Sequence, residues 1–130
     1  MLNKRGEICV TNRPHGGAGF HLSLLVVALT ARGHEVCQAA NGIEARQQVQ
    51  TPAPDVVLLD WQMPVMGGEE ACRSIRAVSD VPLIVVSALD RSTGASVAGA
   101  IGSLIKPVDV DVLLACVALA LRHRAVKRQV

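Results

Sequence analysis

Short apolar runs recur along the chain with helix-forming segments between them, and this alternation restricts the possible folds more than any other feature. The runs at residues 8–11, 56–59 and 83–86 are apolar at nearly every position, and shorter or weaker ones lie at 35–39 and 104–105. Continuous apolar runs of this length are typical of strands buried on both faces of a parallel sheet. The pattern therefore predicts an α/β fold in which helices cover both faces of a parallel sheet.

The segments between these runs carry start and stop signals for helices. Gly33 stands where a helix would end in a left-handed conformation, and the Asn41-Gly42 turn would open the next helix. Asp109 is placed to cap the last one. Helices are expected at residues 20–32, at about 42–50, and at 69–78, 92–98 and 110–123.

Composition supports a single domain with a real core. The chain has 130 residues, half of them apolar, and a mean hydropathy of +0.36, which excludes intrinsic disorder. The longest apolar run, 112–121, is too short to cross a bilayer, and no signal-peptide pattern precedes the first strand. A cytoplasmic protein is expected.

The four cysteines are scattered and form no Cys-x-x-Cys pair. Each lies inside an apolar segment, so we expect buried, reduced thiols rather than disulfides or metal ligands. They are Cys9, Cys37, Cys72 and Cys116.

Polar side chains close three successive predicted strands: Asp60, Ser87 and Lys106. In a parallel sheet the carboxyl ends of neighbouring strands meet at one crevice. A carboxylate, a hydroxyl and an ammonium group there would form a site for an anionic group, with aspartate as nucleophile or ligand. Any one of them could be an ordinary strand-end residue, but three in succession favour a functional site.

Three segments around these residues resemble the receiver domains of two-component response regulators, and the resemblance extends over nearly the whole chain. The segments are residues 54–69, 82–88 and 104–109, supported by Gly33-His34-Glu35-Val36 and Ala40-Asn41-Gly42. The resemblance implies a doubly wound, five-stranded parallel sheet of the CheY-like type with strand order 2-1-3-4-5. It would comprise residues 1–123, with 124–130 as a basic tail or linker.

The resemblance also implies roles for the strand-end residues. Asp60 would accept a phosphoryl group from the phosphohistidine of a histidine kinase or phosphotransfer protein. Ser87 would contact the phosphoryl oxygens, Lys106 would pair with them, and the backbone carbonyl of Gln62 would help to hold Mg²⁺. Such a domain acts as a signalling switch in a phosphorelay, and we do not expect it to be an enzyme.

The sequence departs from the family in three places. The acidic pair that normally holds Mg²⁺ at the end of the first strand is replaced by Thr11, Asn12 and Arg13. The position of the aromatic switch residue holds Ser103, and the loop at 12–19 is longer than the family's. No cofactor is firmly expected, since Mg²⁺ binding would be weakened by the loss of the acidic pair.

Charge counting shows what the first departure would do. One carboxylate faces Lys106 and Arg13, so the pocket could tolerate the roughly −1.5 to −2 charges of a phosphoryl group without metal. Catalysis of the transfer depends on positioning and charge stabilisation, which the missing ion would otherwise provide. The sequence predicts a degenerate receiver, in which Asp60 is phosphorylated poorly or is held by Arg13 or Lys106.

The first and last helices carry more apolar residues than core packing needs, chiefly at 22–29 and 112–121. This excess predicts a homodimer or an intramolecular contact through these two helices. An alternative function follows, in which the chain is a pseudo-receiver that binds proteins independently of phosphorylation. The basic cluster formed by Arg122, Arg124, Lys127 and Arg128 is expected to be solvated, without direct nucleic-acid binding by this domain.

Two other classes of protein fit less well. The glycines at 16–19 before a helix resemble the opening of nucleotide-sugar glycosyltransferases, but those enzymes need two domains and no complete phosphate-binding motif is present. A flavin module is disfavoured because one Trp, one Phe and no Tyr offer little aromatic surface. The histidines show no metal-ligand spacing.

Overall fold

The computed structural model describes residues 6–11, 25–50, 54–60, 68–87, 100–105 and 108–128. Its centre is a five-stranded parallel sheet with the order β2-β1-β3-β4-β5. This confirms the predicted fold class and strand order. The strands are β1 (Glu7–Thr11), β2 (Glu35–Ala39), β3 (Val56–Asp60), β4 (Leu83–Ser87) and β5 (Gly102–Ile105).

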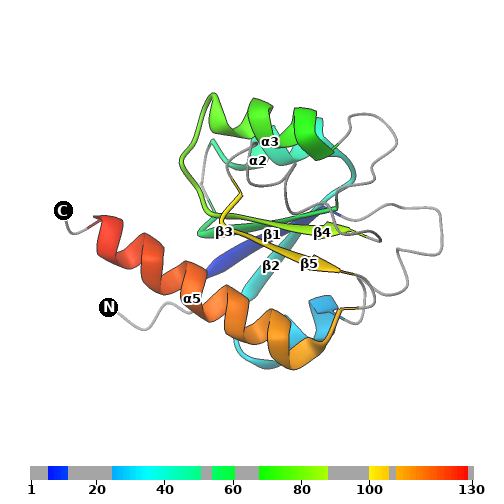
Figure 1. The fold of residues 1–130 in the computed structure, drawn as a ribbon, viewed down its shortest axis with the longest axis vertical. Helices are drawn as coiled ribbons and strands as arrows, with labels where there is room; N and C mark the ends of the chain where they lie inside the picture. The colour runs from blue at the N-terminus through cyan, green and yellow to red at the C-terminus, as the bar shows by residue number, and fades with distance from the viewer. Residues whose placement is uncertain are drawn as a thin grey trace.

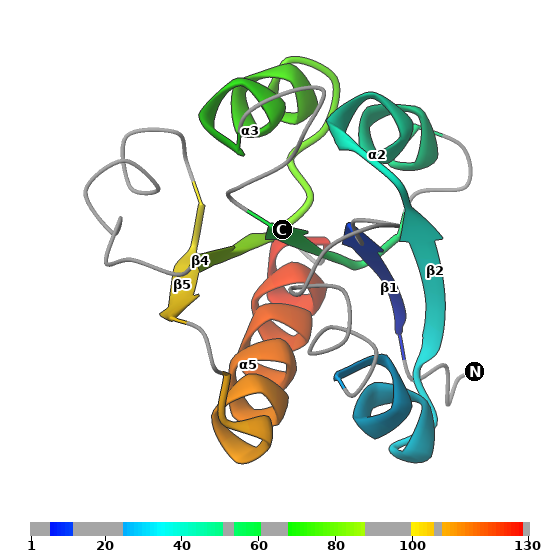
Figure 2. The same ribbon diagram turned by 90° about the vertical axis from the view of Figure 1, so that its right-hand side faces the viewer.

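Helices cover both faces of this sheet (Figure 1). On one face lie α2 (Gly42–Gln48) and α3 (Gly68–Arg76), and on the other lie α5 (Val110–Arg128) and the helical residues 25–31 (Figure 2). Each face has its own core, because alternate residues of a strand point to opposite sides. Val57 and Leu59 pack toward α2 and α3, whereas Leu58 packs with Leu25 and Leu113.

The position of a strand in the sheet sets how deeply it is buried. Every residue of β3 and of β4 is buried, as expected for strands with a neighbour on each side and helices on both faces. The edge strands β2 and β5 expose several positions instead. The central strands thus carry most of the sheet's apolar core.

One prediction about the cysteines is wrong. Cys9 and Cys72 are buried, but Cys37 is exposed and Cys116 is only half-buried. Cys37 lies on the edge strand β2, where one side of the strand lacks a neighbour. Its apolar flanks in the sequence therefore did not guarantee burial. The four thiols are free, as expected.

Three residues predicted to mark helix ends, Gly33, Asn41 and Asp109, take the roles expected of them. The Asn41 side chain accepts a hydrogen bond from the Glu44 amide at 2.9 Å, and the Glu44 carboxylate accepts one from the Ala40 amide at 2.9 Å. Asp109 accepts bonds from two amides at the start of α5, at 2.8 and 3.2 Å. Gly33 has the left-handed φ of +88° predicted for it.

The last helix is longer than predicted, since α5 runs to Arg128 instead of ending near His123. The division into a domain at 1–123 and a tail at 124–130 stays a prediction. Near the start of β1, Gly6 has a φ of +102° and packs against the Leu121 side chain of α5. A Cβ at Gly6 would come within 2.7 Å of Leu121 Cδ2, and its positive φ would strain any other residue, so glycine is favoured here.

Other predictions fall outside the described residues, and the structure does not test them. They are the helix at 92–98, the first residues of the helix at 20–32, and the loop at 12–19. Among the residues that were described, no helix is both long and apolar enough to cross a membrane.

Candidate functional site

Buried polar residues gather at the carboxyl edge of the sheet. The strands β1, β2, β3, β4 and β5 close on Thr11, Ala39, Asp60, Ser87 and Ile105, and Asp60 is the acidic member of this set. Thr11 and Asp60 are each 1% exposed and Ser87 is 3% exposed. Polar groups buried to this extent must be held by hydrogen bonds or charges.

The sheet register brings two of the predicted site residues together. Asp60 pairs with Val86 on β4, and Ser87 is the next residue of that strand. Ser87 in turn pairs with Ile105, the residue before Lys106. The structure thus places Asp60 and Ser87 on adjacent strands at one edge, as predicted, while Lys106 lies outside the described residues.

Thr11 joins the end of β1 to the end of β3 through its hydroxyl group. The Asp60 backbone amide donates a hydrogen bond to Thr11 Oγ1 at 2.7 Å, and that hydroxyl donates to the Leu58 carbonyl at 3.4 Å. The short first bond satisfies the buried amide of Asp60 itself, and the second bond is long. Thr11 therefore fixes the backbone of Asp60, a role that the sequence analysis missed because it treated Thr11 only as a lost carboxylate.

The described part of the pocket offers few ligands for the Mg²⁺ ion that the family implies. Mg²⁺ prefers several oxygen ligands in octahedral geometry, usually with carboxylates among them. Here the end of β1 supplies a hydroxyl group that is already used in two hydrogen bonds. Within the described ranges, no group of three or more His, Cys, Asp or Glu side chains could hold a metal ion. Asn12, Arg13 and Gln62 lie outside those ranges.

The second departure from the family is visible on β5. Ser103 is exposed, and it pairs through its backbone with Val85 of β4. A serine side chain lacks the ring and the volume of an aromatic residue. This position therefore cannot report the state of Asp60 by the movement of a ring.

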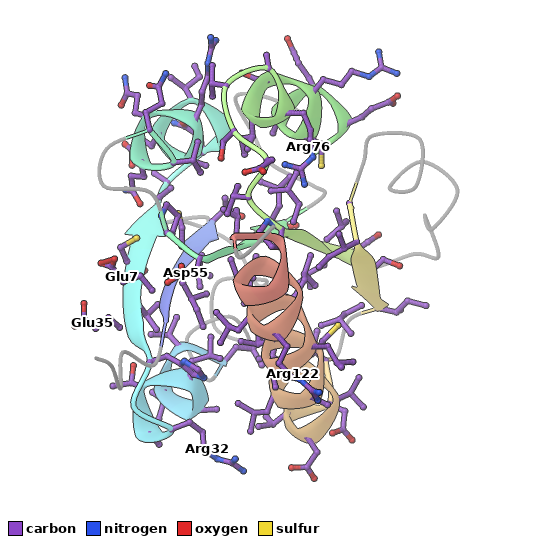
Figure 3. The ribbon with its side chains drawn as sticks, turned by 90° about the vertical axis from the view of Figure 1, so that its left-hand side faces the viewer. Glu7, Arg32, Glu35, Asp55, Arg76 and Arg122 are labelled. Carbon is purple, nitrogen blue, oxygen red and sulfur yellow. The ribbon has the colours of Figure 1, made fainter. Side chains whose placement is uncertain are left out.

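Three acidic residues lie at the opposite end of the sheet, where the strands begin (Figure 3). Glu7, Glu35 and Asp55 stand where β1, β2 and β3 begin, facing the viewer in this figure. The Asp55 carboxylate accepts a hydrogen bond from the Glu7 amide at 2.9 Å, and the Asp55 amide donates to the Glu7 carbonyl at 2.7 Å. Asp55 thus has a structural role, pairing the starts of β1 and β3.

Comparisons with known proteins agree with this geometry. Residues 20–118 match the family described as response regulator receiver domain. The match includes Asp60 and Ser87 and begins after Thr11.

The chain is 38% identical over 104 residues to "Probable transcriptional regulator ycf27" of Pyropia yezoensis, and 34% identical over 102 residues to "Transcriptional regulatory protein AfsQ1" of Streptomyces coelicolor. These alignments cover 77% and 76% of this chain but 42% and 45% of the two relatives. The chain therefore spans less than half the length of these curated relatives.

The structure resembles that of a two-component response regulator from Clostridium difficile, with a TM-score of 0.80 and 25% sequence identity. The superposition covers 91% of this chain and 97% of the other. The strand order, the buried aspartate at the end of β3 and the family match lead to one assignment. The chain belongs to the response regulator receiver domains of two-component signalling.

Proposed function

We propose that this receiver accepts a phosphoryl group on Asp60, and does so slowly because its pocket is degenerate. The observation that carries the proposal is the end of β1, where the Thr11 hydroxyl bonds to the Asp60 amide in place of the family's carboxylate. This hydrogen bond fixes the Asp60 backbone, but Thr11 lacks the negative charge that would attract a divalent cation.

The chemistry assigned to Asp60 is a single transfer. A carboxylate oxygen attacks the phosphorus of a phosphohistidine, the phosphorus–nitrogen bond breaks, and an acyl phosphate forms. Ser87, on the adjacent strand, would donate a hydrogen bond to a phosphoryl oxygen. The phosphoryl donor would be a histidine kinase or a phosphotransfer protein. The domain would then be the acceptor of the phosphoryl group rather than an enzyme, and the pathway would be cytoplasmic.

Burial also supports a slow reaction. Asp60 is 1% exposed, so the approach of a phosphodonor requires movement of its surroundings. Phosphoryl transfer gains most of its rate from positioning and from stabilisation of charge on the moving group. A pocket that lacks part of its cation-binding set loses part of that stabilisation.

A Mg²⁺ titration with a small phosphodonor such as acetyl phosphate tests this proposal. We expect intact mass to show slow addition of one phosphoryl group, with a rate that changes little between EDTA and millimolar Mg²⁺. Asp60→Asn should abolish the addition, and Glu70→Gln, an exposed change on α3, should leave it unaltered. Fast labelling that requires Mg²⁺ would contradict the degenerate pocket, and labelling that persists in Asp60→Asn would contradict the assigned acceptor.

The relatives also suggest what this receiver would regulate. The two relatives named above are called transcriptional regulators, and each is more than twice as long as its aligned part. We propose that the receiver regulates a transcriptional output domain of this kind, joined to it directly or as a partner.

A second candidate function is a pseudo-receiver that dimerises regardless of phosphorylation, and exposed apolar side chains favour it. Val27 in the helical residues 25–31 is 65% exposed, and Leu119 and Val112 on α5 are 64% and 52% exposed. These helices lie next to one another on the same face of the sheet (Figure 2). Large apolar groups in water are stabilised when a partner covers them.

Light scattering across a concentration series tests the dimer. The wild-type chain should change from monomer to dimer as concentration rises, without phosphodonor, and Leu119→Glu should remain a monomer. Ile43→Glu is the matched control, because Ile43 is 45% exposed on α2, across the sheet from α5. A wild-type chain that is monomeric at every concentration, or equal effects of both variants, would rule out this surface.

A further inference from the structure

Two cysteines from different parts of the chain lie side by side on neighbouring strands. Cys9 of β1 and Cys37 of β2 are register partners in a parallel pairing. Register partners in such a pair project to the same face of the sheet, and adjacent strands are about 4.8 Å apart. Disulfides join Cα atoms that are roughly 4.4–6.8 Å apart, so the backbone spacing permits a bond between these residues.

One glutamine side chain from α2 forms hydrogen bonds with both thiols. Gln48 Oε1 accepts a hydrogen bond from Cys9 Sγ at 3.2 Å and from Cys37 Sγ at 3.1 Å. Gln48 Nε2 donates to the Gln38 carbonyl at 3.0 Å. That bond fixes the orientation of the amide, so its oxygen faces the two sulfur atoms and holds them near each other.

The two thiols differ in their exposure to solvent. Cys9 is 0% exposed in the core, whereas Cys37 is exposed on the edge strand. Cys37 and Gln48 line a cavity of about 220 Å³ together with Glu7 and Pro54. A small oxidant can therefore reach the Cys37 sulfur while the protein shields Cys9.

From this arrangement we propose that Cys9 and Cys37 form a reversible disulfide when the protein meets a peroxide. The Cys37 sulfur attacks one peroxide oxygen, the oxygen–oxygen bond breaks, and water leaves as Cys37 becomes a sulfenic acid. The Cys9 sulfur then attacks the Cys37 sulfur, the sulfur–oxygen bond breaks, and the hydroxyl group leaves with the Cys9 proton as a second water. Two thiols lose two electrons, and the peroxide is reduced to two molecules of water.

The electrostatic surroundings assign the order of these steps. Burial raises the pKa of the Cys9 thiol above its usual range, and the Cys37 thiol and the Glu44 carboxylate raise it further. A buried thiol that stays protonated reacts slowly with peroxide, so the exposed Cys37 is oxidised first and Cys9 is the resolving residue. The disulfide would join two strands whose spacing is fixed by sheet pairing. Strained or accessible disulfides are reduced readily, so the bond should be reversible.

Mass spectrometry of the intact protein tests the proposal. After hydrogen peroxide and alkylation of the denatured chain, the wild type should lose two hydrogens, gain no oxygen, and keep two alkylatable cysteines. Digestion without reductant should yield a peptide pair joining Cys9 to Cys37, which a mild dithiol separates. Sulfinic or sulfonic acid at Cys37, or an intermolecular disulfide with Cys9 still alkylatable, would overturn the assignment.

Two variants complete the design. Cys37→Ser, at an exposed position, should leave Cys9 fully alkylatable after peroxide, with a melting curve close to that of the wild type. Cys116→Ser is the control, because Cys116 is half-buried on α5, on the face of the sheet opposite α2. It should form the linked peptide as fast as the wild type. Loss of two hydrogens in Cys37→Ser would show that another pair reacts, and the proposal would fail.

Discussion

Replacing Thr11 by aspartate is expected to make the stability of this protein depend on Mg²⁺. The new carboxylate would lie beside Asp60 at an edge where both positions are 1% exposed, and the Leu58 carbonyl would lose the Thr11 donor. An uncompensated buried charge costs roughly 3–5 kcal/mol. In metal-free buffer we therefore expect Thr11→Asp to lose about 3 kcal/mol of unfolding free energy. Added Mg²⁺ should restore much of it, because a ligand that binds the native state stabilises that state.

Urea unfolding with EDTA and with Mg²⁺ measures this effect. The control is Asp60→Asn added to Thr11→Asp, which removes the repulsion and should regain stability without metal while losing the response to Mg²⁺. The wild type should respond to Mg²⁺ little in either buffer. If the wild type gains as much stability from Mg²⁺ as Thr11→Asp does, the cation site is intact and the proposed degeneracy is wrong.

Thr11→Val should be the second large effect, and it acts without any change in charge. Valine keeps the shape of threonine but removes the hydroxyl that accepts from the Asp60 amide and donates to the Leu58 carbonyl. A buried polar group left without its partner costs about 1–3 kcal/mol. We expect a loss in that range from urea unfolding, together with slower labelling of Asp60, since its backbone is no longer fixed.

A second threonine in the chain provides the matched control. Thr30 also donates its hydroxyl to a backbone carbonyl, that of Val26 at 2.8 Å, but it is exposed on a helix. Thr30→Val removes a similar bond where water can replace it, so stability should change by no more than about 0.5 kcal/mol. Thr11→Ser, which keeps the hydroxyl, should recover most of the loss. Equal effects at Thr11 and Thr30 would show that the Thr11 bond adds nothing specific.

Strand positions were predictable because the core dictates them. The apolar runs at 56–59 and 83–86 form most of β3 and β4, and burial on both faces of the sheet favours apolar side chains at these positions. The beginning of β5 was missed because Gly102 and Ser103 pair with β4 through their backbones, which requires no particular side chain. The extension of α5 to Arg128 differs from the predicted end near His123, because the basic cluster contains no Gly or Pro that would end a helix.

The site was predictable to the extent that strand ends define it. Asp60 and Ser87 follow apolar runs, and parallel strands bring such ends together. The bond between Thr11 and Asp60 depends on the register of β1 against β3, which no local pattern specifies. The exposure of Cys37 depends likewise on the number of neighbours that β2 has. The Thr11–Asp60 bond and the exposure of Cys37 both depend on contacts between segments distant in the sequence. Neither depends on whether a segment forms a helix or a strand.

Both ends of β1 are tied to the region of β3 by bonds between residues far apart in the sequence. The Glu7 amide bonds to the Asp55 carboxylate across 48 residues, and the Asp60 amide bonds to Thr11 across 49. Contacts of such long sequence separation form only after large loops have closed, so they are slow to assemble during folding. We therefore expect the surroundings of Asp60 to be completed late in folding. A fragment that contains β3 without β1 would present Asp60 on an incomplete scaffold, and any substitution that raises the unfolded population lowers the amount of competent receiver in proportion.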